Sequence, residues 1–255
     1  MLREAILIYR SELAVTLRNK PYLMMGMIQP VLYLVLCGPL LAVLVTRAPG
    51  TPAGTSWVDL TPALIVQIAA TNGIYGGYIL LSNLRNGTLD RLRVTPVSRT
   101  SLSLGKALPS VTLSLIQSVI ILVLAGGVFG VSLSIVGVLL VLAIAALTSM
   151  TIACCSHAIV LKLKNEDAFS SLVNIAILPL TLLSGILLPI TPDRAPTWLY
   201  VLSRLNPLAY IVDISRASFR ETLPLVPTLM GAVVIIALAA LALRWNTRTF
   251  QTETA

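Results

Sequence analysis

The sequence predicts an all-α integral membrane protein with six transmembrane helices, and two observations carry this prediction. Of the 255 residues, 56% are hydrophobic and only 11% are charged, whereas about a quarter of the residues in a soluble domain are charged. The apolar residues also gather in six blocks, each long enough to cross the roughly 30 Å hydrocarbon layer as a helix. Blocks of this length exclude a porin-type barrel, whose strands alternate over about ten positions.

The six blocks follow one another without an internal repeat or a long linker, so we expect one transmembrane domain over residues 1–255. Helices are expected because every backbone polar group in a bilayer must find an internal partner. The approximate bounds of the blocks are 23–46, 60–82, 107–129, 134–161, 168–189 and 224–243.

The distribution of Lys and Arg predicts the orientation, because cytoplasmic segments near the spans carry the positive excess. With the N-terminus inside, 13 of the 18 basic residues fall on the cytoplasmic side. The five that remain outside are Arg47, Arg194, Arg204, Arg216 and Arg220. We therefore expect a multi-pass protein of the cell (inner or plasma) membrane with both termini cytoplasmic. The net charge of +8 is spread over several loops and forms no single basic patch, so we expect no nucleic-acid partner.

Residues 1–20 predict an amphipathic helix that lies in the cytoplasmic interface of the membrane. At 100° per residue, one side of this helix gathers Leu2, Ala5, Ile6, Tyr9, Leu13 and Leu17. Arg3, Glu4, Arg10 and Arg18 lie away from that side. An unstructured leader that only contributes positive charge is the alternative.

The segment 83–106, between the second and third blocks, contains the basic run "NGTLDRLRVTPVSR". Thr88 to Val94 has no helix breaker, and Pro96 ends any helix because the residue before proline disfavours the α conformation. A short helix parallel to the membrane on the cytoplasmic side fits this pattern, and a solvated basic turn fits it equally well.

The segment 190–223, between the fifth and sixth blocks, is too polar to cross the membrane and too apolar for an ordinary solvated loop. Trp198, Tyr200 and Tyr210 suit the headgroup level, where aromatic rings are favoured. Extracellular re-entrant helices, broken at Asn206 and Pro207, would explain this composition. A compact external cap would explain it as well.

A polar face on the second block predicts either interhelical hydrogen bonding or the lining of a substrate path, because polar groups in a bilayer face protein or water. Thr71, Tyr75, Tyr78 and Ser82 share this face at helical spacing, with Gln67 and Asn72 nearby. Comparable single residues are Gln117 on the third block and Asn174 on the fifth. As candidates for the path we take Asn72, Tyr75, Tyr78 and Asn174.

The residues that catalysis would need do not occur in a usable pattern. A P-loop requires G-x-x-x-x-G-K-[ST], but Gly105-Lys106 is followed by Ala107. His157 is the only histidine, which excludes a two-histidine metal site within the chain. We expect no catalytic residue, no metal ligand and no cofactor on this chain.

Two motifs of the chain resemble the type 2 ABC exporter permeases. "LPLTLLSGILLPI" (178–190), followed by "RLNPLAYIVDISR" (204–216), is similar to the family's extracellular signature. The signature positions are Ser184, Gly185, Pro189, Asn206, Pro207, Tyr210, Asp213 and Arg216. "RLRVTPVSR", with "LGK" shortly after it, resembles the cytoplasmic loop of the daunorubicin-resistance permease branch.

The resemblance implies a partner for the basic segment. In the family this loop is a coupling helix that docks on a separate ATP-binding cassette ATPase subunit, which carries Mg-ATP. The implied contact residues are Arg91, Arg93, Pro96 and Arg99. Many relatives carry an acidic residue just before the glycine of this loop, whereas Arg85 and Asn86 precede Gly87 here.

The resemblance also implies a dimer with a second permease chain, identical or related, in which spans one and five line the seam. The apolar path favours export of an amphiphilic drug, antibiotic or lipid, and a polysaccharide or lipid-linked glycan is the runner-up substrate. A passive channel or a membrane anchor for a signalling complex is the alternative of another class. These alternatives differ in whether they depend on ATP.

Overall fold

The computed structural model describes residues 2–18, 20–40, 55–88, 98–131, 134–186, 190, 195–220 and 225–253. All the regular elements in these ranges are helices, in agreement with the all-α prediction. In chain order they are α1 (Leu2–Arg18), α2 (Lys20–Leu32), η1 (Tyr33–Cys37), α4 (Thr55–Arg85), α6 (Arg99–Phe129), α7 (Ile135–Leu163), α8 (Glu166–Leu183), α9 (Thr197–Arg204), α10 (Pro207–Phe219) and α11 (Leu225–Glu253).

Five of these helices are long and apolar enough to cross a membrane: Trp57–Arg85, Arg99–Phe129, Ile135–Leu163, Glu166–Leu183 and Gly231–Thr252. They correspond to the second to sixth predicted blocks. The first block contains a shorter apolar helix over Gly26–Leu40, and its last residues, 41–46, lie outside the described part of the chain. The full six-span layout therefore stays a prediction.

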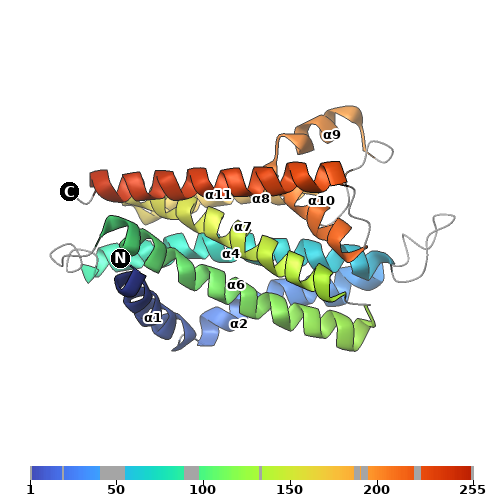
Figure 1. The fold of residues 1–255 in the computed structure, drawn as a ribbon, viewed down its shortest axis with the longest axis horizontal. Helices are drawn as coiled ribbons and strands as arrows, with labels where there is room; N and C mark the ends of the chain where they lie inside the picture. The colour runs from blue at the N-terminus through green and yellow to red at the C-terminus, as the bar shows by residue number, and fades with distance from the viewer. Residues whose placement is uncertain are drawn as a thin grey trace.

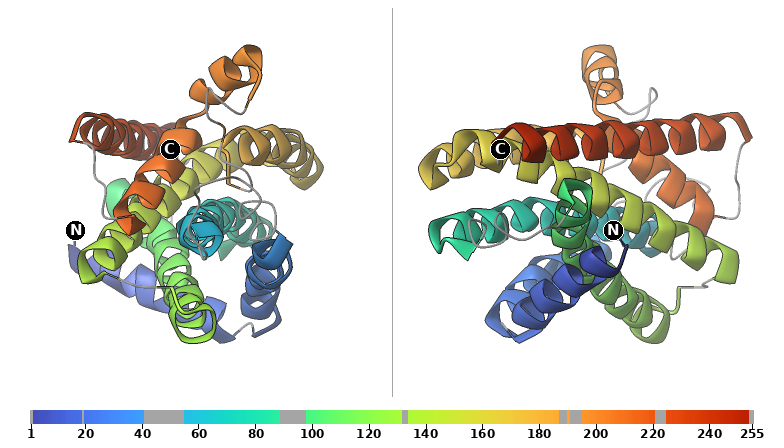
Figure 2. Two further views of the ribbon diagram at one scale, coloured as in Figure 1. Left: turned by 90° about the vertical axis from the view of Figure 1, so that its right-hand side faces the viewer. Right: turned by 60° about the vertical axis from the view of Figure 1, so that its left-hand side comes forward.

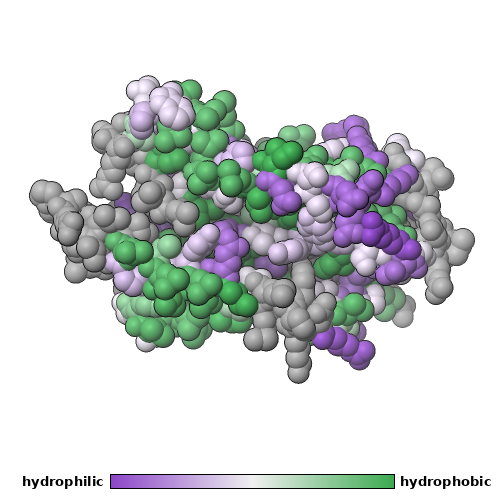
Figure 3. All heavy atoms as spheres, turned by 180° about the vertical axis from the view of Figure 1, so that it is seen from behind, coloured by the Kyte–Doolittle hydropathy of each residue, from purple (hydrophilic) through white to green (hydrophobic). Residues whose placement is uncertain are grey.

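The long helices run roughly along one axis, with α4 in the middle and α7 packed across it (Figures 1 and 2). Both ends of the chain lie toward the left of Figure 1, where α4 ends and α6 begins. We call this the termini end and the opposite one the α9 end, because α9 projects from the bundle there. Figure 3, seen from behind, shows hydrophilic residues gathered toward the termini end, with green apolar surface over much of the remainder.

Local sequence signals explain where the helices begin and end. Ser98 accepts a hydrogen bond from the Ser101 amide at the start of α6, and Asn165 does the same for Asp167 and Ala168 at the start of α8. Such caps satisfy amides that lack a partner within the helix. Gly130, at φ +64°, ends α6 in the left-handed conformation that glycine tolerates best.

The close packing of α4 on α7 depends on small residues. A Cβ atom added at Gly73 would lie 2.7 Å from the Cβ of Ile152 and 2.9 Å from the backbone nitrogen of Ala153. One added at Gly77 would lie 2.5 Å from the Ser156 hydroxyl oxygen. Glycine at these positions lets the two backbones approach, as small residues do in membrane helices generally.

α1 is a helix, as the periodicity predicts, and one face of it packs on α6. Ala5 and Ile8 are buried above Gly105, where an added Cβ would lie 2.9 Å from the Cβ of Ile8. The Tyr9 hydroxyl lies 2.8 Å from the Thr112 hydroxyl. Ile6 and other residues of the predicted apolar side are exposed instead, because the other helices cover only part of that side. Placement of α1 at a membrane interface stays a prediction.

The segment 190–223 contains two helices, α9 and α10, separated at the predicted break. Asn206 caps α10 by accepting a hydrogen bond from the Leu208 amide at 3.0 Å, and Pro207 occupies the first helical position, where its missing N–H costs nothing. Whether these helices enter the membrane stays a prediction.

Candidate transport site

Arg216 of α10 joins three helices at the α9 end. Its guanidinium donates to the backbone carbonyls of Gly185 (2.7 Å), Ile186 (3.0 Å) and Asp59 (3.1 Å). The residue is only 7% exposed. A rigid guanidinium with several donors suits this task, because it supplies hydrogen bonds to carbonyls beyond the end of α8 and in the first turns of α4.

Asn206 forms a second connection between α10 and α8. Its amide nitrogen donates to the Leu180 carbonyl at 2.8 Å, while its oxygen caps α10. α8 ends just beyond, where Ser184 is buried and Gly185 adopts φ +71°. The left-handed conformation at Gly185 turns the chain, and the next carbonyls reach Arg216. Asn206 and Arg216 together fix the end of α8, and we call this arrangement the α8 clamp.

The remaining signature residues lie beside the α8 clamp or outside the described part of the chain. Asp213 pairs with Arg204 at 2.8 Å, and the Arg204 guanidinium lies 4.9 Å from the ring centre of Tyr200 and 5.4 Å from that of Tyr210. Pro189 falls outside the described residues. The structure therefore brings most of the predicted signature together around the end of α8.

Charges near the α8 clamp are paired. Arg220 forms an ion pair with Asp59, and the hydrogen bond from its side chain to this carboxylate raises the pKa of Arg220. Burial lowers the pKa of Arg216, an effect that the nearby Asp59 and Asp213 carboxylates oppose. Both arginines stay charged at neutral pH, because a guanidinium group is not deprotonated in proteins.

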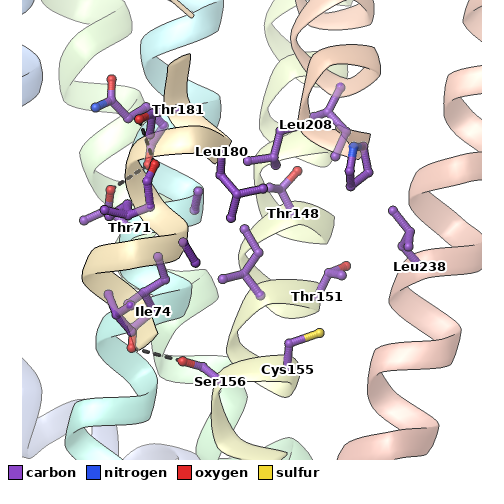
Figure 4. A pocket seen from close by; sticks show the side chains of 18 of the residues that line it. Thr71, Ile74, Thr148, Thr151, Cys155, Ser156, Leu180, Thr181, Leu208 and Leu238 are labelled. Carbon is purple, nitrogen blue, oxygen red and sulfur yellow. Dashed lines mark hydrogen bonds between the residues drawn. The ribbon is translucent and has the colours of Figure 1, made fainter. Parts of the chain in front are cut away.

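A cavity of about 290 Å³ lies beneath the α8 clamp, between α4, α7, α8, α10 and α11 (Figure 4). Leu208 and Pro207 cover it from α10, directly after the Asn206 cap. Its longest walls are single faces of α7 and α8. The α7 residues of the lining are Thr148, Thr151, Ile152, Cys155, Ser156 and Ile159, and those of α8 are Phe169, Leu172, Val173, Ala176, Ile177, Leu180 and Thr181.

The four predicted path residues do not line this cavity. Asn72 is buried, and its amide donates to Gln117 of α6 at 2.7 Å. Tyr78 packs edge-on against Phe169 with ring centres 4.9 Å apart. Tyr75 is partly exposed, and Asn174 is exposed on the outer side of α8. Their roles in a path stay predictions.

Gln67 and Thr71, which belong to the polar face noted in the sequence, do line the cavity. The contributions of α7 and α8 to the lining were not predicted from the sequence. Hydroxyl residues at i and i+3, such as Thr148 and Thr151, were an available signal on an otherwise apolar block.

Three of the predicted coupling residues, Arg91, Arg93 and Pro96, lie outside the described part of the chain, whereas Arg99 begins α6. The described residues on both sides of 89–97 contact other helices. Arg85 of α4 forms an ion pair with Glu166 of α8. The Ser98 amide donates to Glu4 of α1 at 3.4 Å.

A buried ion pair joins α1 and α6 at the termini end. The Lys106 ammonium lies 2.6 Å from the Glu12 carboxylate, which also accepts a hydrogen bond from Asn83 of α4 at 3.2 Å. A paired charge avoids most of the cost of burial. The N-terminal helix is therefore fastened to the bundle at the end that carries the basic segment.

Within the described ranges, no group of three or more His, Cys, Asp or Glu residues lies close enough to hold a metal ion. His157 is buried in α7, where a Cβ added at Gly76 of α4 would lie 3.3 Å from its Nε2 atom. It occupies a tightly packed position between helices.

Comparison with known proteins identifies the family. The ABC-2 type transporter family matches residues 3–219. The chain is 32% identical over 210 residues to the putative transport permease ycf38 of Porphyra purpurea, covering 80% of this chain and 70% of that protein. It is 29% identical over 217 residues to ycf38 of Cyanophora paradoxa, covering 81% and 71% of the two chains. It is also 26% identical over 167 residues to the probable multidrug ABC transporter permease YbhR of Escherichia coli, covering 62% and 42%. With most of its length matched, the chain belongs to the ABC-2 type transporter family.

Proposed function

We propose that this chain is the transmembrane subunit of an ATP-driven exporter that moves an amphiphilic drug, antibiotic or lipid out of the cell. Family membership supports a transport subunit and not a catalytic one. The observation that favours an amphiphile is the cavity beneath the α8 clamp, whose lining carries no charged side chain. A polysaccharide or lipid-linked glycan is favoured less, because many hydroxyl groups would need hydrogen-bond partners there.

A separate ATP-binding cassette subunit is proposed to supply the energy through residues 83–106, and a second permease chain to complete the path. Support for this coupling comes from the flanks of the segment. Arg85 joins one flank to α8, and α8 forms a wall of the cavity. Movement of the segment would therefore reach the cavity through this helix.

The first test is co-expression with a candidate ATPase subunit, purification of this chain in mild detergent, and measurement of ATP hydrolysis on the recovered complex. Recovery of both subunits with ATPase activity is the expected result. Recovery of this chain alone, also after reconstitution in lipid nanodiscs, would favour a passive channel or membrane anchor instead. Substrate uptake into inside-out vesicles would establish the direction.

Charge reversal tests the docking role directly. Arg91→Glu combined with Arg93→Glu is expected to reduce recovery of the ATPase, because two cations at the proposed contact become anions. The matched control is Arg244→Glu combined with Arg248→Glu. These residues lie near the C-terminus, which is also predicted to be cytoplasmic but is not part of the proposed contact. Equal recovery from both double variants would argue against docking at residues 83–106.

A further inference from the structure

The hydroxyl residues of the cavity have their hydrogen-bond donors satisfied within the molecule. Their hydroxyls all donate to backbone carbonyls: Thr71 to Gln67 (2.9 Å), Thr148 to Ile144 (2.8 Å), Thr151 to Leu147 (2.7 Å), Thr181 to Ile177 (2.8 Å) and Ser156 to Ile74 (3.2 Å). Figure 4 shows several of these residues with their bonds. Besides the amide of Gln67, whose Oε1 atom is buried without a hydrogen-bond partner, and the Cys155 thiol, the lining offers a ligand mainly hydrocarbon. An apolar chain that enters therefore needs no hydrogen-bond partner.

The lining is long and narrow. It follows α7 from Thr148 to Ile159 and α8 from Phe169 to Thr181, which at 1.5 Å per residue is about 16 to 18 Å. This length is close to one leaflet of a hydrocarbon layer that is roughly 30 Å thick. The cavity volume of about 290 Å³ lies just below the range of roughly 300 to 1,000 Å³ that is usual for small-molecule binding sites. A single extended chain suits these dimensions better than a whole lipid or a compact polycyclic drug.

The cavity also reaches the outer surface of the molecule. Leu172 and Leu180 of α8 both line it and are 41% and 38% exposed. On the outer side of α8, Ile175, Leu178 and Leu182 are exposed at 75%, 62% and 60%, interrupted by the exposed polar residues Ser171 and Asn174. An acyl chain can therefore approach the cavity over apolar residues of α8, from the bilayer or from the proposed seam with a second permease chain.

We propose that the cavity binds one acyl chain of a membrane lipid, with the headgroup left outside. The inference rests on the proposed function in one respect: it specifies the class of ligand for the same cavity that is proposed there to take an amphiphile. Binding itself requires neither ATP nor the ATPase subunit. It can therefore be measured on this chain alone.

The test uses this chain in nanodiscs that contain a phosphatidylcholine with a diazirine at the end of one acyl chain. After illumination, mass spectrometry locates the lipid adducts. We expect them to concentrate on residues 148–159 and 169–181. In Ala176→Phe, which fills the cavity from α8, the adduct yield on α7 should fall roughly tenfold, as expected when an overpacked site excludes its ligand.

Ile175→Phe is the matched control, because it adds a ring at the adjacent position, which does not line the cavity. Its yield should equal that of the unmodified chain. If Ala176→Phe does not elute as a monodisperse species, Thr151→Phe fills the cavity from α7 instead. Equal yields from cavity and control variants would overturn the proposal, as would stronger labelling of the same residues by a sterol probe.

The result separates the two proposals. Adducts in the cavity without recovery of an ATPase would support the acyl-chain site and contradict the exporter. An active ATPase complex without these adducts would support the exporter and reject the acyl chain as its ligand.

Discussion

α4 and α8 are both long apolar helices, but in their most apolar stretches 72% of α4 is buried within the molecule and only 6% of α8. α4 is fixed along its length by close packing on α7 and α6. α8 is held mainly near its ends, by the α8 clamp on one side and by Phe169, Ser170 and Glu166 on the other. Between these anchors lies the cavity. We therefore expect α8 to move more readily than α4, whose displacement would open the core.

The largest effect is expected from removing the α8 clamp. Arg216→Met leaves the carbonyls of Gly185, Ile186 and Asp59 without their donor, and each unsatisfied buried acceptor costs about 1 to 3 kcal/mol. We expect a loss of at least about 3 kcal/mol in stability, seen as a lower thermal unfolding temperature in detergent. Arg220→Met is the control, because it removes a half-exposed pair worth about 1 kcal/mol or less. Similar shifts in both variants would show that Arg216 does not hold the end of α8.

The second effect concerns the packing of α4. Gly73→Ala places a methyl group against Ile152 and the backbone of Ala153, which forces the helices apart at a cost of about 1 to 3 kcal/mol. Gly127→Ala in α6 is the matched control, because no atom lies within 4 Å of the added carbon. Thermal unfolding of the two variants checks this. An unchanged Gly73→Ala protein would mean that the α4–α7 contact tolerates separation.

The lengths of the apolar blocks predicted the five described helices that are long and apolar enough to cross a membrane, because burial in a membrane dictates composition over a whole helix. The apolar blocks are shorter than the helices that contain them. α4 begins at Thr55, before the block at 60–82, because polar residues can also occupy the first turn of a helix. The break at Asn206 and Pro207 was predicted correctly because capping and the missing proline N–H are local properties.

The cavity could not be predicted, because its lining depends on which faces of five helices meet. Polar residues in the second block fit either interhelical hydrogen bonding or the lining of a path. Asn72 bonds to Gln117 of α6, in agreement with the first alternative, whereas Thr148 of α7 bonds to its own helix. A polar side chain in a membrane helix can satisfy itself in several ways, and the sequence alone does not distinguish them.

The third prediction compares two asparagines. Asn72→Ala removes the donor to Gln117 and should cost about 1 kcal/mol, in the range of hydrogen bonds between membrane helices. Asn174→Ala, on the exposed side of α8, should change stability by less than about 0.5 kcal/mol. A double-mutant cycle of Asn72→Ala with Gln117→Ala measures the pair. Additive effects within error would contradict a direct bond.

The smallest effect on stability, and the most informative about coupling, is expected at the other end of α8. Arg85 and Glu166 pair at side-chain exposures of 58% and 46%, so Arg85→Glu should change stability by no more than about 1 kcal/mol. It nevertheless breaks a connection between the flank of the proposed docking segment and the wall of the cavity. We therefore expect substrate-stimulated ATP hydrolysis by the complex to fall, while basal hydrolysis stays unchanged. Arg85→Glu with Glu166→Arg restores the opposite charges and should restore stimulation. If substrate stimulates ATP hydrolysis no more in the charge-swapped double variant than in Arg85→Glu alone, the Arg85–Glu166 pair does not transmit movement from residues 83–106 to α8. The sparse packing of α8 would then serve ligand access and not energy transfer.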